Sequence, residues 1–585
     1  MRRLIASLGL AVAISVGVNA SIDGSPIANA RLRAAELQSG TSAGLAVATG
    51  PAAVAKAAAD GDRESVRALL KKGVDVNEAQ GDGTTALHWA AIKGDAEMAQ
   101  MLIYAGANVR ATTRIGAYTP LYLAAKGGYP DVVAALLAAG ADAKAVTANG
   151  TTPLMIAAAA GDTKSITALV ENGAEINARD GAKGETPLIF AAGFNRTDAV
   201  KLLLARGADH KVTTTVVDLF ALTAPEEEAM QRGTGGNSTR PVNNRPADVA
   251  GATRAYRYNE LISTQGGLSA LLFAARQGYT DTAMALLDGG ADVNQANAGD
   301  KTTPLLMAII NGHFDLATKL IDHGANVNTA AFNGVAPLFA VLNLQWAPKS
   351  LYPSPKAYQQ QKTTYLELMQ TLLAKGADPN ARVARKVWYQ AYNSDYAGFD
   401  EAGATPFFRA AYASDVAAMK LLVANGADPY IGTFKPAGRP FTGEGTRQIQ
   451  DTSGLPAVPY GGPGILPIHA ATGVGYGEGF AANSHRYAPT GFLPAIQYLV
   501  EETGADVNAA DHEGNTPLHL CASRGDNACI NYLVSKGADA TRVNREGNTT
   551  VDMANGPVQR TQPYPETIKL LEGLGAKNNH RCITC

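Results

Sequence analysis

Residues 151–181 read TTPLMIAAAAGDTKSITALVENGAEINARDG, a stretch with two apolar segments at helical spacing. Thr152 suits the position that caps a helix through its side chain, and Pro153 suits the first helical position, where no backbone N–H is needed. The alanines that follow Leu154 allow this first helix to approach its neighbours closely. A second apolar segment follows, and Gly173 ends it where a left-handed residue is wanted. The stretch therefore predicts a helix–turn–helix unit.

The same pattern recurs along the chain. A Gly-Ala-Asp-like ending returns at spacings that are most often 33 or 34 residues, and starts such as TTPL, YTPL or ETPL follow most of these endings. One such unit cannot bury its apolar face alone, so stacked units must share a continuous core. We therefore expect an all-α repeat, an α-solenoid, rather than several globular domains. The glycines of the endings are Gly73, Gly106, Gly140, Gly173, Gly207, Gly290, Gly324, Gly376, Gly426, Gly504, Gly537 and Gly575.

The unit resembles the ankyrin repeat, whose signature is Thr-Pro-Leu-His-x-Ala in 33 residues. TTALHWAA, which begins at Thr84, and NTPLHLCA, which begins at Asn515, carry this signature. The resemblance covers residues 51–579 and implies about twelve helix-turn-helix repeats with long loop insertions. The last unit has Asp552 where histidine is usual, and we interpret this as a polar substitution on an exposed end cap.

Insertions break the period near residues 215–265, 344–363, 385–402, 430–465 and 473–492. Long loops in a compact array are usually either functional or irregular. Because Gly, Pro, Asn and Thr are dense in the 215–265 segment, we expect much of it to be irregular, like a tether.

Aromatic side chains gather in two of the other insertions. Amphipathic aromatic residues on a loop are typical of protein-binding hot spots. The alternative is that these rings seal the insertions against the repeats, and the two roles do not exclude each other. The predicted partner-binding residues are Trp388, Tyr389, Tyr392, Tyr396, Phe399, His485 and Tyr487.

The sequence contains no recognisable catalytic motif. His88, His469 and His519 occupy the histidine position of the repeat signature, where a structural role is expected. The glycine-rich stretch GVGYGEG at 473–479 lacks the strand–helix context of a phosphate-binding loop. We therefore expect no enzyme, no metal site and no cofactor. A ligand-binding or hydrolytic site in the 430–492 insertions remains as an alternative.

The four cysteines form two groups. Cys521 and Cys529 replace apolar residues of one unit, and we expect both in the core. Cys582 and Cys585 lie in HRCITC, residues 580–585, which we interpret as a mobile, exposed tail that closes a small disulfide in an exported protein. CITC also resembles a c-type haem attachment motif without its histidine. A redox or electron-transfer module that uses these two cysteines is therefore a further alternative.

The first residues have the order of a removable secretory signal. Arg2 and Arg3 precede an apolar stretch, and small residues end at Ala20, with a second candidate cleavage site at Ala30. We expect a signal peptide at 1–20, a linker at 21–50 and export to the periplasm or beyond the cell, with no membrane span in the mature chain. The formal net charge of −2 gives no electrostatic footprint for nucleic acid. The expected function is an exported scaffold that binds another protein in the cell envelope.

Overall fold

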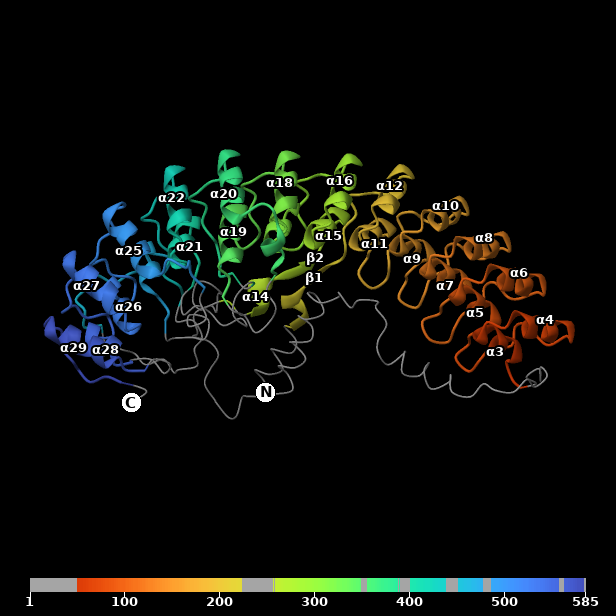
Figure 1. Cartoon of the computed structure of the whole chain (residues 1–585), viewed down its shortest axis with the longest axis horizontal. Helices are drawn as coiled ribbons and strands as arrows, with labels where there is room; N and C mark the ends of the chain where they lie inside the picture. The colour runs from red at the N-terminus through yellow and green to blue at the C-terminus, as the bar shows by residue number, and fades with distance from the viewer. Residues whose placement is uncertain are drawn as a thin grey trace, which may run out of the picture.

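The computed structural model describes residues 50–223, 256, 258–348, 355–387, 389, 400–437, 451–476, 486–556 and 562–582. Within these ranges twelve helix pairs follow one another in chain order, which confirms the predicted all-α repeat. Figure 1 shows the pairs side by side in an arc, with the first helix of each pair on the concave side and the second on the convex side. We call these the inner and the outer helix of a unit. The loop that leads from one unit to the next is called a finger.

In units 1 to 6 the inner and outer helices are α3 (Ala53–Asp60) and α4 (Arg63–Lys71), α5 (Ala86–Lys93) and α6 (Ala96–Tyr104), α7 (Pro120–Gly127) and α8 (Pro130–Ala138), α9 (Pro153–Ala160) and α10 (Thr163–Glu171), α11 (Pro187–Gly193) and α12 (Thr197–Ala205), and α15 (Ala270–Gln277) and α16 (Thr280–Asp288). In units 7 to 12 they are α17 (Pro304–Ile310) and α18 (Phe314–Asp322), α19 (Pro337–Gln345) and α20 (Tyr365–Ala374), α21 (Pro406–Tyr412) and α22 (Val416–Ala424), α23 (Pro467–Thr472) and α25 (Phe492–Glu501), α26 (Pro517–Ser523) and α27 (Asn527–Ser535), and α28 (Thr550–Ala554) and α29 (Pro565–Gly573).

Local chemistry fixes the ends of the helices in each unit. In unit 4 the backbone N–H of Met155 donates to Thr152 Oγ1 at 3.2 Å, and Pro153 is the first residue of α9. The helix stops at Gly161, whose φ of 81° is left-handed. Asp162 then caps α10 by accepting a hydrogen bond from the backbone N–H of Lys164 at 3.2 Å. The Thr-Pro start and the Gly-Asp turn thus have the roles that the sequence predicts.

The Gly-Ala-Asp ending has a second purpose in the structure. In unit 6, Asp292 accepts a hydrogen bond from the backbone N–H of Asn294 at 2.8 Å, which folds the start of the finger. The side chain of Asn294 then donates to Gly324 O at 3.3 Å and accepts from the backbone N–H of Asn326 at 2.7 Å, both in unit 7. This asparagine clamp joins neighbouring units through main-chain groups. It recurs at Asn77, Asn177, Asn328, Asn380 and Asn508.

One cluster of buried side chains runs through the whole array, from Ala52 to Ala576. Small residues on the inner helices, such as Ala157 and Ala158, are fully buried and allow these helices to pack closely. Leu154 is also fully buried. The chain is therefore one solenoid with one core, and no helix in the described ranges reaches the length and hydropathy that a membrane span requires.

The two ends of the 215–265 insertion contain regular secondary structure. β1 (Val216–Asp218) pairs antiparallel with β2 (Thr264–Gly266), and α14 (Tyr258–Ile262) precedes β2. The two ends of the insertion therefore pair with each other between adjacent units, and together they lengthen the finger at this place. Residues 224–255 and 257, to which the predicted irregular tether belongs, lie outside the described residues.

The prediction that Asp552 is an exposed cap residue is wrong. Asp552 is fully buried and caps α28 by accepting from the Thr549 backbone N–H at 3.0 Å. It also accepts from the Asn579 side chain at 2.8 Å. A carboxylate fits here because Asn579 offers amide donors to it, whereas the signature histidines meet a carbonyl of the next unit.

The histidines of the signature link units, as expected for a structural role. The backbone N–H of Thr516 donates to His519 Nδ1 at 3.2 Å, so Nε2 carries the proton and donates to Asn548 O of the next unit at 3.3 Å. His88 and His469 make the equivalent contacts to Tyr118 O and Ala509 O. A second proton on Nδ1 would face a backbone N–H group, which disfavours the charged form of all three rings.

Acid should therefore weaken unit 11 through His519. Burial lowers the pKa of His519 to about 4, whereas an unfolded histidine has a pKa of about 6.5. As the pH falls below about 6.5 the unfolded chain takes up this proton first, so stability should fall until about pH 4. His519→Gln should flatten part of this slope, and His323→Gln, at an exposed position, should leave it unchanged. Urea unfolding at several pH values between about 7.5 and 4.5 measures both, and equal slopes in the two variants would contradict the assignment.

Candidate functional site

Large apolar side chains recur at one position of the inner helices, directly after the histidine of the signature. In units 2 to 7 this side chain is only half-buried, although the residues beside it are in the core. Each inner helix has inner helices on both sides and its outer helix behind it, so a half-exposed side chain must face the concave side (Figure 1). We call this row the concave stripe. Its members are Trp89, Leu123, Ile156, Phe190, Phe273 and Met307.

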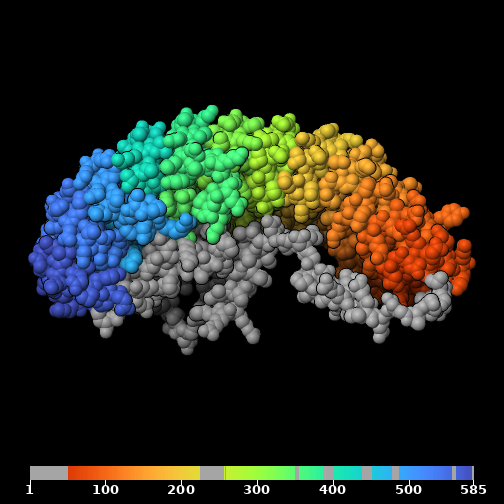
Figure 2. Space-filling view, in the orientation of Figure 1, coloured from red at the N-terminus to blue at the C-terminus, as the bar shows by residue number. Residues whose placement is uncertain are grey.

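The stripe ends where the insertions between helices begin. In units 8 to 11 the same position is buried, and the side chains are at most 6% exposed. Figure 2 shows the arched body with its hollow side below, where units 1 to 7 occupy the red to green part. The apolar row thus belongs to the first seven of the twelve units. The buried residues at this position are Ala340, Arg409, Ala470 and Leu520.

Exposed apolar side chains also lie on the fingers next to units 2 to 4. Ile115 is 80% exposed and Val146 is 58% exposed, each on a finger. Tyr118 stacks on Tyr122 with ring centroids 5.1 Å apart, which holds it at the foot of its finger. Large exposed apolar groups of this kind are unusual on a monomer surface when they are contiguous, and they mark interaction sites.

Arg409 replaces the apolar side chain in unit 9 and anchors a buried polar network. Its guanidinium donates to Asn343 Oδ1 at 3.0 Å and to Trp346 O at 2.8 Å. Asp415 accepts from Trp346 Nε1 at 3.0 Å and from the Tyr365 hydroxyl at 2.8 Å. Burial lowers the pKa of Arg409 to about 10 and raises the pKa of Tyr365. The network fastens unit 8 to unit 9, and it brings no nucleophile and base together.

Insertions that are far apart in the sequence meet in space. Arg385, at the start of the 385–402 insertion, lies over the ring of Tyr256 from the 215–265 insertion. Burial, and then the charges of Tyr256 and Asp400, raise the pKa of Tyr460 in the 430–465 insertion. The two insertions between helices also meet.

The second meeting point joins units 8 and 10. The guanidinium of Arg486 donates to the hydroxyl of Tyr358 at 3.2 Å. Tyr358 belongs to the 3₁₀-helix η2 (Ala357–Gln360) of the 344–363 insertion, and Arg486 belongs to the 473–492 insertion. Sequence spacing alone could not indicate these meetings, because both depend on the stacking of units between them.

Two of the seven predicted binding residues lie in the described ranges. Tyr389 packs against the core and its hydroxyl is buried, which raises its pKa and fits the sealing role. Tyr487 is 45% exposed, with its ring centroid 4.3 Å from that of Phe492. These two residues are on different insertions. Outside the described residues lie Trp388, Tyr392, Tyr396, Phe399 and His485, so a joint role for all seven stays a prediction.

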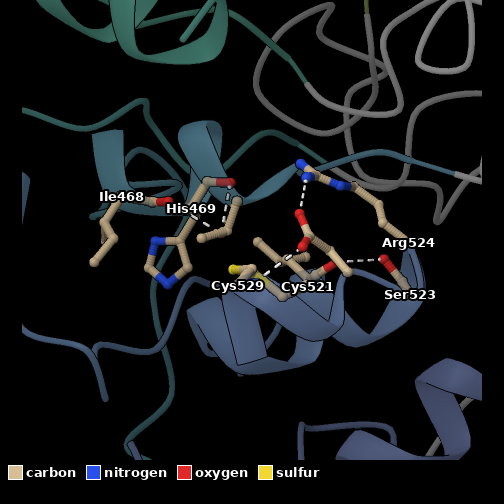
Figure 3. The surroundings of a disulfide bond; sticks show 9 residues. Ile468, His469, Cys521, Ser523, Arg524 and Cys529 are labelled. Carbon is tan, nitrogen blue, oxygen red and sulfur yellow. Dashed lines mark hydrogen bonds and ion pairs between the residues drawn. A yellow bond between two sulfur atoms is a disulfide. The ribbon is translucent and has the colours of Figure 1, made fainter. Parts of the chain in front are cut away.

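Cys521 and Cys529 are fully buried, as expected, but they form a disulfide that the sequence analysis did not predict. Their Cα atoms are 6.1 Å apart, and the bond joins α26 to α27 within unit 11 (Figure 3). A separation of eight residues places the two side chains on the facing sides of paired helices. The repeat register already places both cysteines in the core, so their separation of eight residues was the one sequence clue to this disulfide.

Beside the disulfide, Arg524 forms an ion pair with Asp526 at 2.8 Å (Figure 3). Its guanidinium also lies over the ring of Phe492, at 3.6 Å from the centroid. Both contacts help to fix the turn between α26 and α27. Within the described ranges, no group of three His, Cys, Asp or Glu side chains could hold a metal ion.

The described part of the C-terminal segment makes hydrogen bonds to the last unit, and the mobility of the cysteine-containing tail stays a prediction. Thr549 Oγ1 donates to Lys577 O at 2.6 Å, and Arg581 donates to Glu546 O at 2.8 Å and to Asn548 Oδ1 at 2.9 Å. Polar residues suffice for docking because the last unit offers buried hydrogen-bonding groups. Cys582 is disulfide-bonded. Its predicted partner, Cys585, lies outside the described residues, so that pairing stays a prediction.

Comparison with known proteins gives limited but consistent matches. Protein phosphatase 1 regulatory subunit 27 of Homo sapiens is 34% identical over 89 residues, which are 15% of this chain and 53% of that protein. Protein fem-1 homolog A of Bos taurus is 30% identical over 101 residues, 17% of this chain and 14% of that protein. Oxysterol-binding protein-related protein 1 of Rattus norvegicus is 41% identical over 51 residues, 9% of this chain and 5% of that protein. The chain thus spans about half of the first relative and small parts of the other two.

The family model of ankyrin repeats, in three copies, matches residues 28–113, 54–147, 121–214, 253–331 and 484–581. These matches cover more than half of the chain, and they overlap the units that the structure shows. The chain therefore belongs to the ankyrin-repeat family, whose repeats mediate protein–protein interactions.

Proposed function

We propose that this protein is an exported scaffold that binds another protein along the concave stripe of units 2 to 7. The stripe itself is the observation that carries the proposal. Six consecutive units keep a large apolar side chain only partly buried at one position, although units 8 to 11 show that the fold allows the position to be buried. Keeping such surface in water is unfavourable, at roughly 25 cal/mol per Å² of apolar area. A partner that covers the stripe recovers this energy.

The rigidity of the array supports the same function. The inner helices that carry the stripe share one continuous core, and asparagine clamps hold the fingers beside them. A surface that is already in place loses little conformational freedom when a partner binds. Trp89 and Phe190 supply the aromatic groups that often dominate the binding energy of an interface.

Two observations support export. Residues 1–20 have the charged, apolar and small-residue order of a removable secretory signal. The buried disulfide between Cys521 and Cys529 suits an oxidising compartment, because cytosolic proteins are usually kept reduced. The periplasm or the extracellular space is therefore the proposed location.

Export should be visible at the N-terminus of the purified protein. We expect the mature chain to begin at Ser21, or at Arg31 if the second cleavage site is used. Sequencing of the protein isolated from its native cells measures this directly. A mature chain that still begins with Met1 and is recovered from the cytosol would contradict export, while leaving the binding proposal untouched.

Partner binding should map to the concave side. A photo-reactive amino acid at Leu123 or Ile156 should give one discrete crosslinked product in native cells, because these positions face the proposed partner. The same group at Ala134 or Lys164, which are exposed on outer helices, should give none. Equal products from both sets, or products from the outer helices alone, would contradict a concave site.

The captured partner then allows a quantitative comparison. Phe190→Lys should weaken binding by at least about tenfold, because it places a charge in an apolar contact and removes the ring. Ala134→Lys makes the same charge change on the convex side and should leave binding unchanged. Circular dichroism checks that both variants keep their helices.

A further inference from the structure

The guanidinium of Arg385 lies over two aromatic rings that come from different parts of the chain. The carbon at the centre of its guanidinium is 4.2 Å from the centroid of the Phe332 ring and 4.7 Å from that of the Tyr256 ring. Phe332 is on the finger between units 7 and 8, and Tyr256 is in the insertion before unit 6. Arg385 itself opens the insertion before unit 9. Three loops thus build one environment for a single cation.

The backbone fixes where this side chain begins. The N–H groups of Ala384 and Arg385 both donate to Asn333 O, at 2.9 and 3.2 Å. Gly334 has a left-handed φ of 81°, and a Cβ at this glycine would overlap the backbone nitrogen of Ala384. The start of the insertion therefore lies tightly against the preceding finger. The guanidinium is positioned before any ligand arrives.

A nearby arginine shows what a purely structural role looks like. Arg382 lies over the ring of Phe434 at 3.9 Å, and its guanidinium donates to Gly403 O at 2.9 Å and to Gly432 O at 2.6 Å. Arg385 is stacked in a similar way and is half-exposed. Among the residues that the structure describes, however, none accepts a hydrogen bond from its guanidinium or forms an ion pair with it.

The two ring contacts are made by the guanidinium group as a whole and use none of its N–H donors, so a ligand can approach along its edge. That edge carries N–H donors in a planar fork that matches the two oxygens of a carboxylate. Stacking on the rings stabilises the cation without using these donors. The geometry points to a receptor for one carboxylate group, and we propose that Arg385 binds a glutamate or aspartate side chain of a protein partner.

The local charge favours a carboxylate over a phosphate. A phosphate group carries a charge of about −1.5 to −2, and one guanidinium cannot neutralise it. Arg382 is already bound to main-chain carbonyls, so it supplies no second cation for a phosphate. Arg385, Phe332 and Tyr256 lie on the loops between units, and none of them belongs to the concave stripe. This proposal can therefore fail or succeed independently of binding along the stripe.

A short peptide of glutamates with blocked ends is the probe, and fluorescence anisotropy on the full mature chain measures its binding. The wild-type protein should bind this peptide and should not bind a matched glutamine peptide. Arg385→Gln should weaken binding by about tenfold. Arg385→Lys should also weaken it, by at least about threefold, because an ammonium group has no planar fork. Phe332→Leu should weaken it because one stacking face is lost, and circular dichroism checks its fold.

Two controls separate this site from general charge and from the concave stripe. Arg67→Gln removes one positive charge from an exposed outer helix of unit 1 and should change binding by less than about 1.5-fold. Phe190→Lys should leave peptide binding at the wild-type level.

Three results would overturn the proposal. The first is that the wild-type protein does not prefer the glutamate peptide to the glutamine peptide. The second is that Arg385→Gln or Arg385→Lys binds as tightly as wild type. The third is that inorganic phosphate, at matched ionic strength, displaces the peptide in an Arg385-dependent way and binds more tightly, which would make the site a phosphate receptor.

Discussion

The structure depends on the packing of each inner helix against the inner helices of the neighbouring units. Fully buried alanines such as Ala157 and Ala158 set the spacing, since larger side chains would push the helices apart. No unit has a complete core of its own, so the array is stable only as a stack. The asparagine clamps and the signature histidines then satisfy main-chain groups between units. These polar links fix the register, while burial of apolar surface supplies most of the stability.

This division explains how the chain carries long insertions. The 215–265 insertion separates α11 from α15 in the sequence, yet the two units touch directly. The hydroxyl groups of Thr197 and Thr282 are 2.8 Å apart, and Thr282 also donates to Asn195 Oδ1 at 2.8 Å. The insertion leaves and rejoins the stack at the base of a finger, through β1 and β2. Loops can therefore grow on the fingers and meet one another, as Tyr256 and Arg385 do, without a break in the core.

Local patterns in the sequence predict those features, such as helix ends, that depend only on neighbouring residues. Thr152, Pro153 and Gly173 each fix a helix end by themselves, and their recurrence was enough to predict the solenoid and its units. The sequence could not predict contacts that arise only after stacking. Asp552 looked like an exposed cap because its partner, Asn579, follows 27 residues later in a tail with no repeat signal. Cys521 and Cys529 were assigned correctly to the core, but their bond depends on how α26 faces α27.

The candidate sites divide in the same way. The concave stripe was present in the sequence as a repeated position, for example Leu123 and Ile156, but its importance appears only when its exposure is known. The aromatic residues of the insertions were visible in the sequence, and Tyr389 shows why composition alone is insufficient, since its hydroxyl is buried against the repeats. The contacts of Arg385 with the rings of Phe332 and Tyr256 join three loops, and the spacing of these residues in the sequence does not predict their contact.

The central claim is that one continuous core, carried across the 215–265 insertion, holds the concave surface in place. Hydrogen–deuterium exchange of the full chain with Leu271→Ala tests it most directly, because Leu271 is 1% exposed in α15, the first helix after the insertion. Leu271→Ala leaves a cavity in the core beside α15. The account predicts faster exchange in α15 and also in α11 and α17, the inner helices on either side of it. Faster exchange confined to α15 and α16, or spreading only toward α17, would show that the core is interrupted at the insertion and would contradict the account.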